Sequence, residues 1–379
     1  MNRLSIFLML SFFCLSCKQN LKTSTEFSLS KQDSVRFDYL ADLNLMDVNS
    51  DGDRLLLYSY LKKSFLIIDT SGKLLSTFEL DPNVLGRLPF LSSQFVSNGF
   101  AIGTDKGFFI MDFNGDVIQE FQFDRNFVPS LARFSSENPL ISHEEKFYFS
   151  YPQSNLEIGI NSPQFYQNSK LIGVYDKKSK KVDLSAPLPQ NSVYKNGKSH
   201  QLDDFDAIIR LKDSIFFVAL KKELAIFKYD LANLNGEPRR ISLKIDGFYV
   251  NEGIPMDLVN PDMLMFDPTY GSIENFYNFN DEFIVFYKKG YEEADRQKFD
   301  LLNSPVELEE FQEIAKNKYP YFVGYFDNQG NLLKELELSS DFNPNNTIFS
   351  GDYLYSISNP STISEEDFYT INIYNLTKK

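Results

Sequence analysis

The chain is poor in the residues that metal and redox chemistry use most. Its 379 residues include two cysteines, two histidines and no tryptophan. Both cysteines, Cys14 and Cys17, lie near the N-terminus, so a chain cut before Cys17 keeps no pair for a disulfide or a thiolate metal site. The domain that follows must be held by its hydrophobic core, for which the chain is long enough.

Basic residues are also scarce relative to acidic ones. The chain has 38 lysines and arginines against 52 aspartates and glutamates, which gives a formal net charge of −14. An acidic protein repels phosphate backbones, so we expect no nucleic-acid partner. Two short basic runs, Lys177–Lys181 and Arg239–Arg240, are interpreted as solvated hairpin turns.

Aromatic residues are abundant, with 37 phenylalanines and 21 tyrosines. Flat rings pack well on a pleated, half-buried surface, so this excess favours β-strands. Hydrophobic residues make up 42% of the chain and charged residues 24%, which is typical of a globular fold and excludes disorder for most of its length.

The N-terminus has the pattern of an export signal. Arg3 precedes an apolar run, Leu4–Leu15, that is too short to span a bilayer comfortably, and the small residue Ser16 comes directly before Cys17. The segment resembles a bacterial lipobox, although Cys14 stands where that motif favours leucine. The resemblance implies cleavage after residue 16 and a diacylglycerol thioether on Cys17. An ordinary secretory signal or a buried helix are the alternatives.

The residue after Cys17 bears on the destination. In lipoproteins an aspartate there signals retention in the inner membrane, whereas this chain has Lys18. We therefore expect an outer-membrane lipoprotein, periplasmic or surface-exposed, held to the membrane by its N-terminal lipid. Residues 17–24 are predicted to form a polar tether, and residues 25–379 one folded domain.

One sequence pattern recurs along that domain. Two apolar residues precede D-x-x-G-x, and two apolar residues and an alternating tail follow it. The clear copies have their aspartates at Asp69, Asp112 and Asp327. The aspartate can cap the turn through its own backbone, and the glycine can take the positive φ that other residues resist. Each copy therefore predicts a β-hairpin with one buried face.

Weaker copies bring the number of predicted turns to six. Asp176, Asp230 and Asn375 follow similar apolar pairs. The shortest interval, between Asp69 and Asp112, is close to the roughly 40–50 residues of a four-stranded propeller blade. Each turn is preceded by a further apolar segment that we interpret as the second strand of a blade; these segments are Leu55–Tyr60, Phe100–Gly103, Phe147–Tyr151, Ile215–Leu220, Phe283–Tyr287 and Tyr353–Ser358.

These repeats predict an all-β fold, a six-bladed β-propeller. Only four residues follow Asn375, so the last blade lacks its outermost strand. The segment Thr25–Ser30 resembles the alternating tail of the repeat, and we expect it to supply that strand and close the ring.

Four long connections interrupt the repeats. Those at 152–170 and 289–319 fall between second and third strands, and those at 187–205 and 246–273 precede the fourth and fifth blades. All four are expected on one face, called here the loop face, where a binding site would lie. Within blade five, Ser304, Pro305 and Glu307 predict the start of a helix with Leu308, Phe311, Ile314 and Ala315 on one side.

The six repeats, with their D-x-x-G hairpins, and the lipobox together resemble uncharacterised six-bladed propeller lipoproteins of Bacteroidota, within the NHL/TolB-like group. The resemblance covers nearly the whole chain after Cys17. It implies an architecture and no agreed reaction, so no catalytic residue is assigned.

One segment has the spacing of a calcium loop. Asp47, Asn49 and Asp51 place oxygen ligands at alternate positions before Gly52. The twelfth position, however, is Tyr58, where an EF-hand has glutamate. A plain turn is the favoured interpretation, calcium is the weaker alternative, and no other cofactor is expected.

The remaining candidate residues lie in or beside the loop face. His200 could act as a base or remain a solvated loop residue, and Arg210 could reach the central channel. Tyr194, Tyr249, Tyr270 and Tyr291 could form a binding platform or pack the loops onto the blades.

The sequence favours a binding function over catalysis. The leading hypothesis is a membrane-anchored interaction propeller that recognises a protein, peptide or small ligand on its loop face. The alternative is a hydrolase or lyase with its site at the mouth of the channel, which would need carboxylates or a histidine–carboxylate pair converging there.

Overall fold

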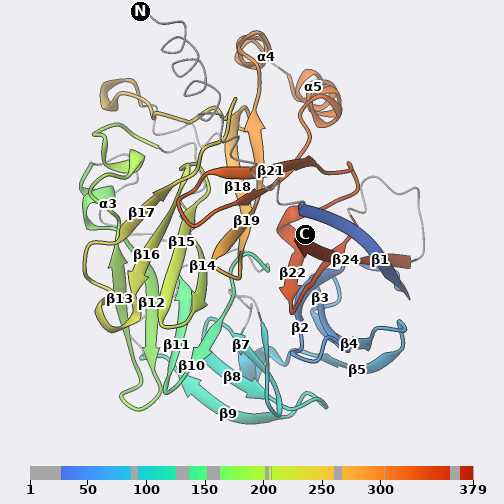
Figure 1. The fold of residues 1–379 in the computed structure, drawn as a ribbon. Helices are drawn as coiled ribbons and strands as arrows, with labels where there is room; N and C mark the ends of the chain where they lie inside the picture. Colours follow the sequence, from blue (N-terminus) through green and yellow to red (C-terminus); the bar gives the residue numbers. More distant parts are fainter. Residues whose placement is uncertain are drawn as a thin grey trace, which may run out of the picture.

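The strands form six four-stranded antiparallel sheets arranged as a ring (Figure 1). This computed structural model describes residues 27–86, 93–124, 136–151, 163–200, 205, 207–259, 267–302, 304–358 and 368–378. The six-bladed propeller predicted from the repeats is therefore confirmed. The predicted signal peptide, Cys17 and the tether lie outside the described residues.

The blades follow the chain in order, each from its innermost to its outermost strand. Blade one comprises β2 (Asn44–Val48), β3 (Arg54–Ser59), β4 (Ser64–Asp69) and β5 (Leu74–Glu79), and blade two comprises β6 (Gln94–Val96), β7 (Gly99–Gly103), β8 (Gly107–Met111) and β9 (Val117–Gln122). Blade three comprises β10 (Ile141–His143), β11 (Lys146–Ser150), β12 (Lys170–Asp176) and β13 (Lys181–Pro187), and blade four comprises β14 (Ala207–Lys212), β15 (Ile215–Leu220), β16 (Ala225–Asp230) and β17 (Arg239–Ser242). Blade five comprises β18 (Tyr270–Phe279), β19 (Glu282–Gly290), β20 (Phe322–Phe326) and β21 (Leu332–Glu337).

The sixth blade joins the two ends of the chain. It contains β22 (Thr347–Ser350), β23 (Tyr353–Ile357) and β24 (Phe368–Lys378), and its outermost strand is β1 (Phe27–Asp38). Strand β1 pairs antiparallel with β24 from Phe27 opposite Lys378 to Asp38 opposite Phe368. The predicted closure by an N-terminal strand is therefore confirmed, and the strand extends eight residues beyond Ser30, through a bulge between Lys31 and Asp33.

The D-x-x-G turns fix both the hairpin and the contact with the preceding blade. The Asp69 carboxylate accepts hydrogen bonds from the backbone N–H groups of Ser71 and Lys73, and Gly72 has a φ of +82°. A methyl group at Gly72 would overlap the carbonyl oxygen of Arg36 in β1. Glycine therefore serves two needs here, because the turn requires a positive φ and the neighbouring blade leaves no room for a side chain.

Two of the weaker copies depart from this pattern, and one of the basic runs is not a turn. Asp176 caps its turn, but Lys180 takes the positive φ. Asn375 lies within β24, paired with Ser30, because β1 extends the ladder past the predicted turn. The interpretation of Arg239–Arg240 as a turn is wrong, since both residues belong to β17 and Arg240 forms an ion pair with the buried Glu223.

The aromatic residues predicted to favour strands fill the spaces between blades. Phe78 of blade one stacks on Phe100 of blade two, with ring centroids 5.1 Å apart. Phe108 of blade two packs against Phe147 of blade three at 4.8 Å. Burying whole rings between sheets removes much apolar surface from water, so these contacts form the core in place of a disulfide framework.

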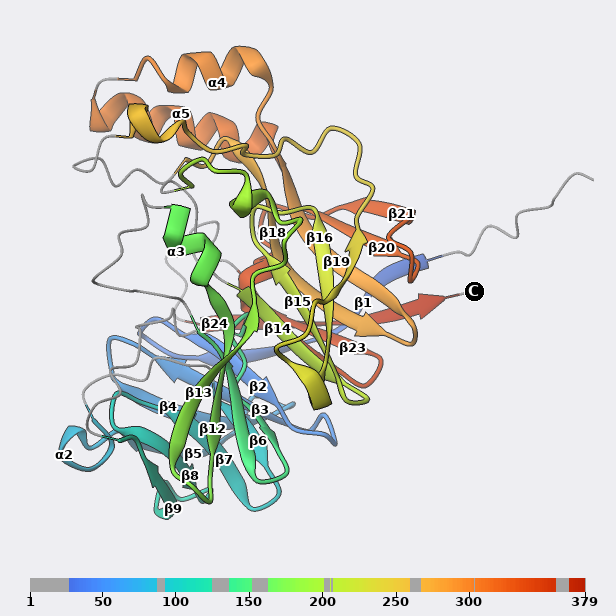
Figure 2. The same cartoon turned by 90° about the vertical axis from the view of Figure 1, so that its left-hand side faces the viewer.

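The helices lie together on one face of the ring. Figure 2 shows α3 (Pro163–Asn168), α4 (Glu293–Phe299) and α5 (Pro305–Lys318) on the left-hand side, which is the predicted loop face. The start of β1 and the end of β24 lie on the opposite side. We call that side the turn face, because the hairpins that join strands one and two of every blade, and strands three and four of blades one to five, reverse there.

The start of helix α5 is as predicted, but its buried face is narrower. Ser304 and Glu307 form the expected capping box. Phe311 and Ala315 are buried against Tyr291, whereas Ile314 is 61% exposed and Leu308 is half-buried. The expectation that Ile314 shares the buried face is wrong, because the helix packs on a small cluster and not on a broad sheet. Besides Tyr291, that cluster contains Phe299, Leu302 and Tyr319.

The short helix α4 was not predicted, since its sequence lacks apolar residues at helical spacing. The Lys318 ammonium lies 2.7 Å from a Glu292 carboxylate oxygen and 2.8 Å from one of Asp295, so the end of α5 holds α4 in place. Within the described ranges, no helix is both long and apolar enough to cross a bilayer.

Candidate functional site

Two of the predicted site residues, Tyr194 and His200, lie in a buried aromatic cluster. Both side chains are about 1% exposed, and their ring centroids are 4.7 Å apart. The hydroxyl oxygen of Tyr166 accepts a 3.0 Å hydrogen bond from the backbone N–H of His200. Tyr166, Tyr194 and Phe205 pack on one another, so these rings hold the 187–205 connection against α3 and blade four.

A second pair of predicted residues, Tyr249 and Tyr270, forms a stack near the rim of the loop face. Their rings lie 5.2 Å apart and 10° from parallel. Tyr249 is 38% exposed, and the guanidinium carbon of Arg296 lies 3.2 Å from its ring centroid. The structure thus brings these tyrosines together, but a cation from α4 already occupies one face of the pair.

Arg210 contacts the inner parts of three blades. Its guanidinium donates hydrogen bonds to the Asn275 side chain in β18 and to the carbonyl oxygen of Glu137, just before β10. The same group lies 4.9 Å from the centroid of the Tyr277 ring. Arg210 therefore lies where the innermost strands converge and joins blades three, four and five.

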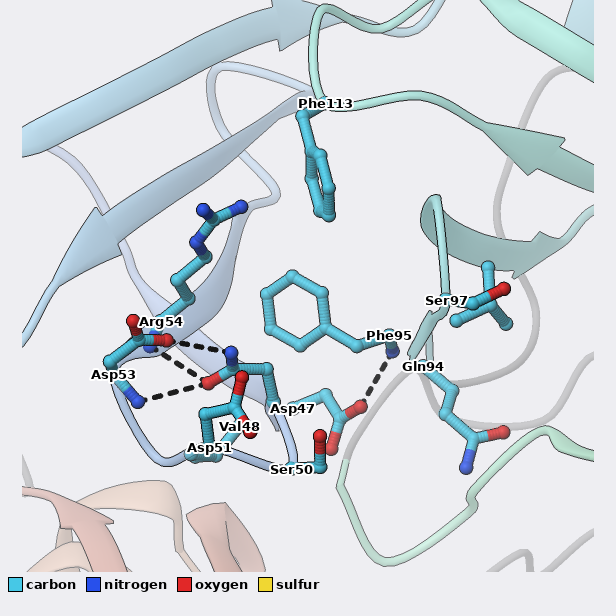
Figure 3. A pocket seen from close by; sticks show the side chains of 12 residues that line it. Asp47, Val48, Ser50, Asp51, Asp53, Arg54, Gln94, Phe95, Ser97 and Phe113 are labelled. Carbon is cyan, nitrogen blue, oxygen red and sulfur yellow. Dashed lines mark hydrogen bonds between the residues drawn. The ribbon is translucent and has the colours of Figure 1, made fainter.

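The calcium-like segment forms part of a cavity of about 550 Å³ between blades one and two, on the turn face (Figure 3). Figure 3 shows that its polar side chains point toward different partners. The Asn49 side-chain oxygen accepts hydrogen bonds from the backbone N–H groups of Asp53 and Arg54, whereas Asp47 accepts one of 2.6 Å from the N–H of Phe95. Among the described residues, no group of three or more His, Cys, Asp or Glu side chains is placed to hold a metal ion.

Burial sets the charge state of Asp47. Removal from water raises the pKa of its carboxyl group to about 7, although the N–H groups of Phe95 and Val48 act in the opposite direction. The protonated form is therefore well populated at neutral pH, which weakens this side chain as a ligand for a cation.

A second cavity, of about 490 Å³, opens on the loop face beneath α5. We call it the α5 pocket. Tyr291, Tyr319 and Tyr321 line it together with Lys288, and α5 contributes polar side chains; the other lining residues are Pro268, Gln312, Lys316, Asn317, Pro320, Glu337, Leu338, Ser339 and Ser340. Of the predicted site residues, Tyr291 alone lines this pocket.

Lys288 is a charged residue in the wall of the α5 pocket, beside two of its tyrosines. Its side-chain nitrogen lies 5.1 Å from the Tyr291 ring centroid and 5.6 Å from that of Tyr321. Among the described residues it has no carboxylate within 4.0 Å and donates no hydrogen bond. Burial lowers the pKa of Lys288; Glu274 acts to raise it and Lys222 to lower it further.

Behind Lys288 lies a buried group of charges at the loop-face end of blades three to five. Lys221 and Glu137 form an ion pair with a 3.0 Å nitrogen–oxygen distance and side chains 5% and 2% exposed. Burial disfavours the Glu274 carboxylate, but Lys221 and the Ser272 hydroxyl offset this, so its pKa is lowered. With Lys222, Lys288 and Arg210, the part of this group that the structure describes contains four cations and two carboxylates.

A pair of lysines at the end of a strand is a sequence signal for charge at the loop-face end of blade five. In the second strand of blade five, the apolar run Phe283–Tyr287 ends in Lys288 and Lys289. Adjacent residues of a strand point to opposite sides, and both sides of a middle propeller strand face neighbouring blades, so both lysines were expected at the blade interfaces. The sequence does not tell which of the two lines a cavity.

Comparison with known proteins supports the fold alone. The sequence matches no family model, and no curated protein sequence is significantly similar to it. Among solved structures, a member of the DUF4221 family from Bacteroides vulgatus aligns with a TM-score of 0.64 over 94% of this chain and 100% of that one, at 12% identity. At this identity the likeness establishes a shared propeller architecture.

Two further structures align over most of their length with lower scores. A Bacteroides fragilis protein described as exported has a TM-score of 0.47 at 13% identity, over 96% of this chain and 97% of that one. A luciferin-regenerating enzyme has a TM-score of 0.43 at 11% identity, over 93% and 95%.

Proposed function

We propose that this protein is a non-enzymatic binding propeller that captures a small organic ligand in the α5 pocket. The observation that carries the proposal is the placement of Lys288, whose ammonium group faces two tyrosine rings at the edge of this cavity. Cavities of about 300–1,000 Å³ lined by aromatic rings and a few polar groups are typical of small-molecule sites. The pocket also lies on the face where the long connections gather.

The pocket walls come from well-anchored elements, which favours binding to a preformed site. Tyr291 stacks on Tyr319 with 4.3 Å between ring centroids, and it also packs against Phe311 of α5. A capping box and the ion pairs to α4 hold that helix at its two ends. A preformed site loses less entropy when a ligand binds, because its side chains are already ordered.

A ligand screen tests the proposed site. Metabolites, sugars, amino acids and short peptides are tested for thermal stabilisation of the domain, and hits are measured by calorimetry. We expect Tyr321→Ala to weaken the confirmed hits at least tenfold and Tyr249→Ala, outside the pocket, to leave them unchanged. Hits that are insensitive to Tyr321→Ala would place binding elsewhere and refute the proposal.

We propose further that a lipid on Cys17 anchors the protein to the outer membrane, with the α5 pocket facing away from it. The proposal rests on the lipobox-like segment and on the position of Phe27, where β1 begins on the turn face. The ten residues from Cys17 to Phe27 can extend at most about 35 Å, so the turn face would lie near the bilayer. Cys17→Ala should abolish metabolic labelling with palmitate and release the protein from the membrane fraction; labelling that persists would exclude the site.

A further inference from the structure

We infer that the ligand of the α5 pocket is a small organic carboxylate whose charged group binds Lys288. The inference rests on the proposed function of that pocket and adds the chemical class of its ligand. Among the lining residues that the structure describes, Lys288 and Lys316 carry ammonium groups and Glu337 carries a carboxylate. The site is therefore cationic in a protein whose formal net charge is −14.

The surroundings of Lys288 concentrate this positive charge. Counted over the described residues, the neighbouring buried group has more cations than carboxylates, and its Glu137 carboxylate is paired with Lys221. Glu274 accepts a hydrogen bond from the Ser272 hydroxyl and is shared between Lys221, Lys222 and Lys288. In a poorly hydrated site such a surplus produces a strong local field that attracts anions.

A neutral ligand would leave this site incomplete. Covering the pocket removes water from the Lys288 ammonium, which among the described residues has aromatic faces as its contacts and no carboxylate within 4.0 Å. Desolvating a cation without supplying a partner is costly, whereas a carboxylate supplies a charge-assisted hydrogen bond. The rings of Tyr291 and Tyr321 flank the same ammonium group, so a flat or apolar ligand body can pack against tyrosine while its carboxylate reaches Lys288.

Matched pairs of ligands test the inference with the intact domain. Phenylacetate, indole-3-acetate and glucuronate are each compared with their primary amides, which have the same shape and no charge, by thermal shift and calorimetry. We expect at least one acid to bind about ten- to a hundredfold more tightly than its amide. This preference should shrink as sodium chloride is raised, because screening weakens the charge interaction.

Two adjacent lysines provide the matched variants. Lys288→Met keeps the apolar stem and should abolish the preference for the acid, and Lys288→Arg should keep it. Lys289→Met is the control, because Lys289 pairs with Glu335 at 2.8 Å and lies outside the lining of the α5 pocket. Circular dichroism and melting curves establish that each variant is folded.

The outcomes separate the two proposals. Equal affinity for acid and amide, lost in Tyr321→Ala, would overturn the carboxylate inference and leave the pocket as a binding site. A preference for the acid that survives Lys288→Met would also overturn it. If no member of any pair binds the wild-type domain at millimolar concentration, the carboxylate inference fails, and the broader ligand screen decides whether the pocket is a binding site.

Discussion

Asp47 and Lys288 are ionisable side chains whose pKa values burial shifts in opposite directions. Burial raises the pKa of Asp47 to about 7 and lowers the pKa of Lys288, because in both cases it disfavours the charged form. Asp47 can respond by taking up a proton and keeps its hydrogen bond from Phe95. Lys288 lies at the edge of the α5 pocket, where we propose that it binds an anion.

The raised pKa of Asp47 predicts a specific pH dependence of stability. The folded state holds a proton that the unfolded state releases near pH 4, so the free energy of unfolding falls as pH rises from about 4 to about 7. Asp47→Asn keeps an acceptor for the Phe95 N–H and should remove this decline. We expect a difference on the order of 2–4 kcal/mol between the two pH limits, measured by urea unfolding.

Asp51 provides the control for this measurement, because it lies in the same turn and is exposed. Asp51→Asn should leave the pH profile of the wild-type protein unchanged. Parallel profiles for wild type and Asp47→Asn would show that the carboxyl group stays ionised in the fold.

The elements illustrate which parts of the fold depend on local sequence. The D-x-x-G hairpins were predictable because Asp69 caps its own turn and Gly72 adopts the required φ, both from within a few residues. The capping box of α5 was predictable for the same reason. Helix α4 was not, because contacts from Lys318 and Tyr319, more than twenty residues away, hold it in place.

The site depends more strongly on tertiary contacts than the strands do. Tyr291 could be named from its position in a long connection, but its stacking on Tyr319 and the pocket beneath α5 follow from how the insertion folds back. Tyr194 and His200 have the same sequence context and are buried in a different cluster. The position of these residues in long connections therefore indicated that they lie on the loop face and left open which rings face a cavity.

Helix α5 offers a test at the scale of one element. Ser304→Ala removes the side chain that accepts the Glu307 N–H, and loss of such a cap costs about 1 kcal/mol. We expect hydrogen exchange in the first turn of α5 to accelerate roughly fivefold while the strands of blade five are unaffected. Glu309→Ala, at an exposed position of the same helix, serves as control; equal acceleration in both variants would argue against the cap.

Closure of the ring gives a second test at this scale. Deleting residues 24–31 removes the start of β1 and the Phe27 ring, which stacks on Tyr325 of blade five at 4.7 Å. The melting temperature should fall sharply, because the end of β24, from Tyr374 to Lys378, loses its outer partner and the blades lose an apolar contact. Shortening the predicted tether by deleting residues 18–23 is the control, and equal melting temperatures for both deletions would contradict the role of β1.

At the scale of the whole molecule, the two faces of the ring are expected to lie at different distances from the membrane. Single cysteines at Asn328, in a turn-face hairpin of blade five, and at Gln312, on α5, can be labelled with a fluorescent donor. In the lipidated protein on vesicles with acceptor lipids, energy transfer should be stronger from residue 328 than from residue 312. Equal transfer from both sites would mean that the ring has no fixed orientation.

Strand β1 also determines how the domain bears a mechanical load. If the lipid is pulled away from the propeller, the force enters at Phe27, at one end of the β1–β24 ladder, where Lys378 is its partner. A pull along the strand shears the ladder, so many hydrogen bonds share the load, whereas a pull away from the sheet opens them one pair at a time from Phe27. The direction of tension at the anchor would therefore set the force at which the ring opens.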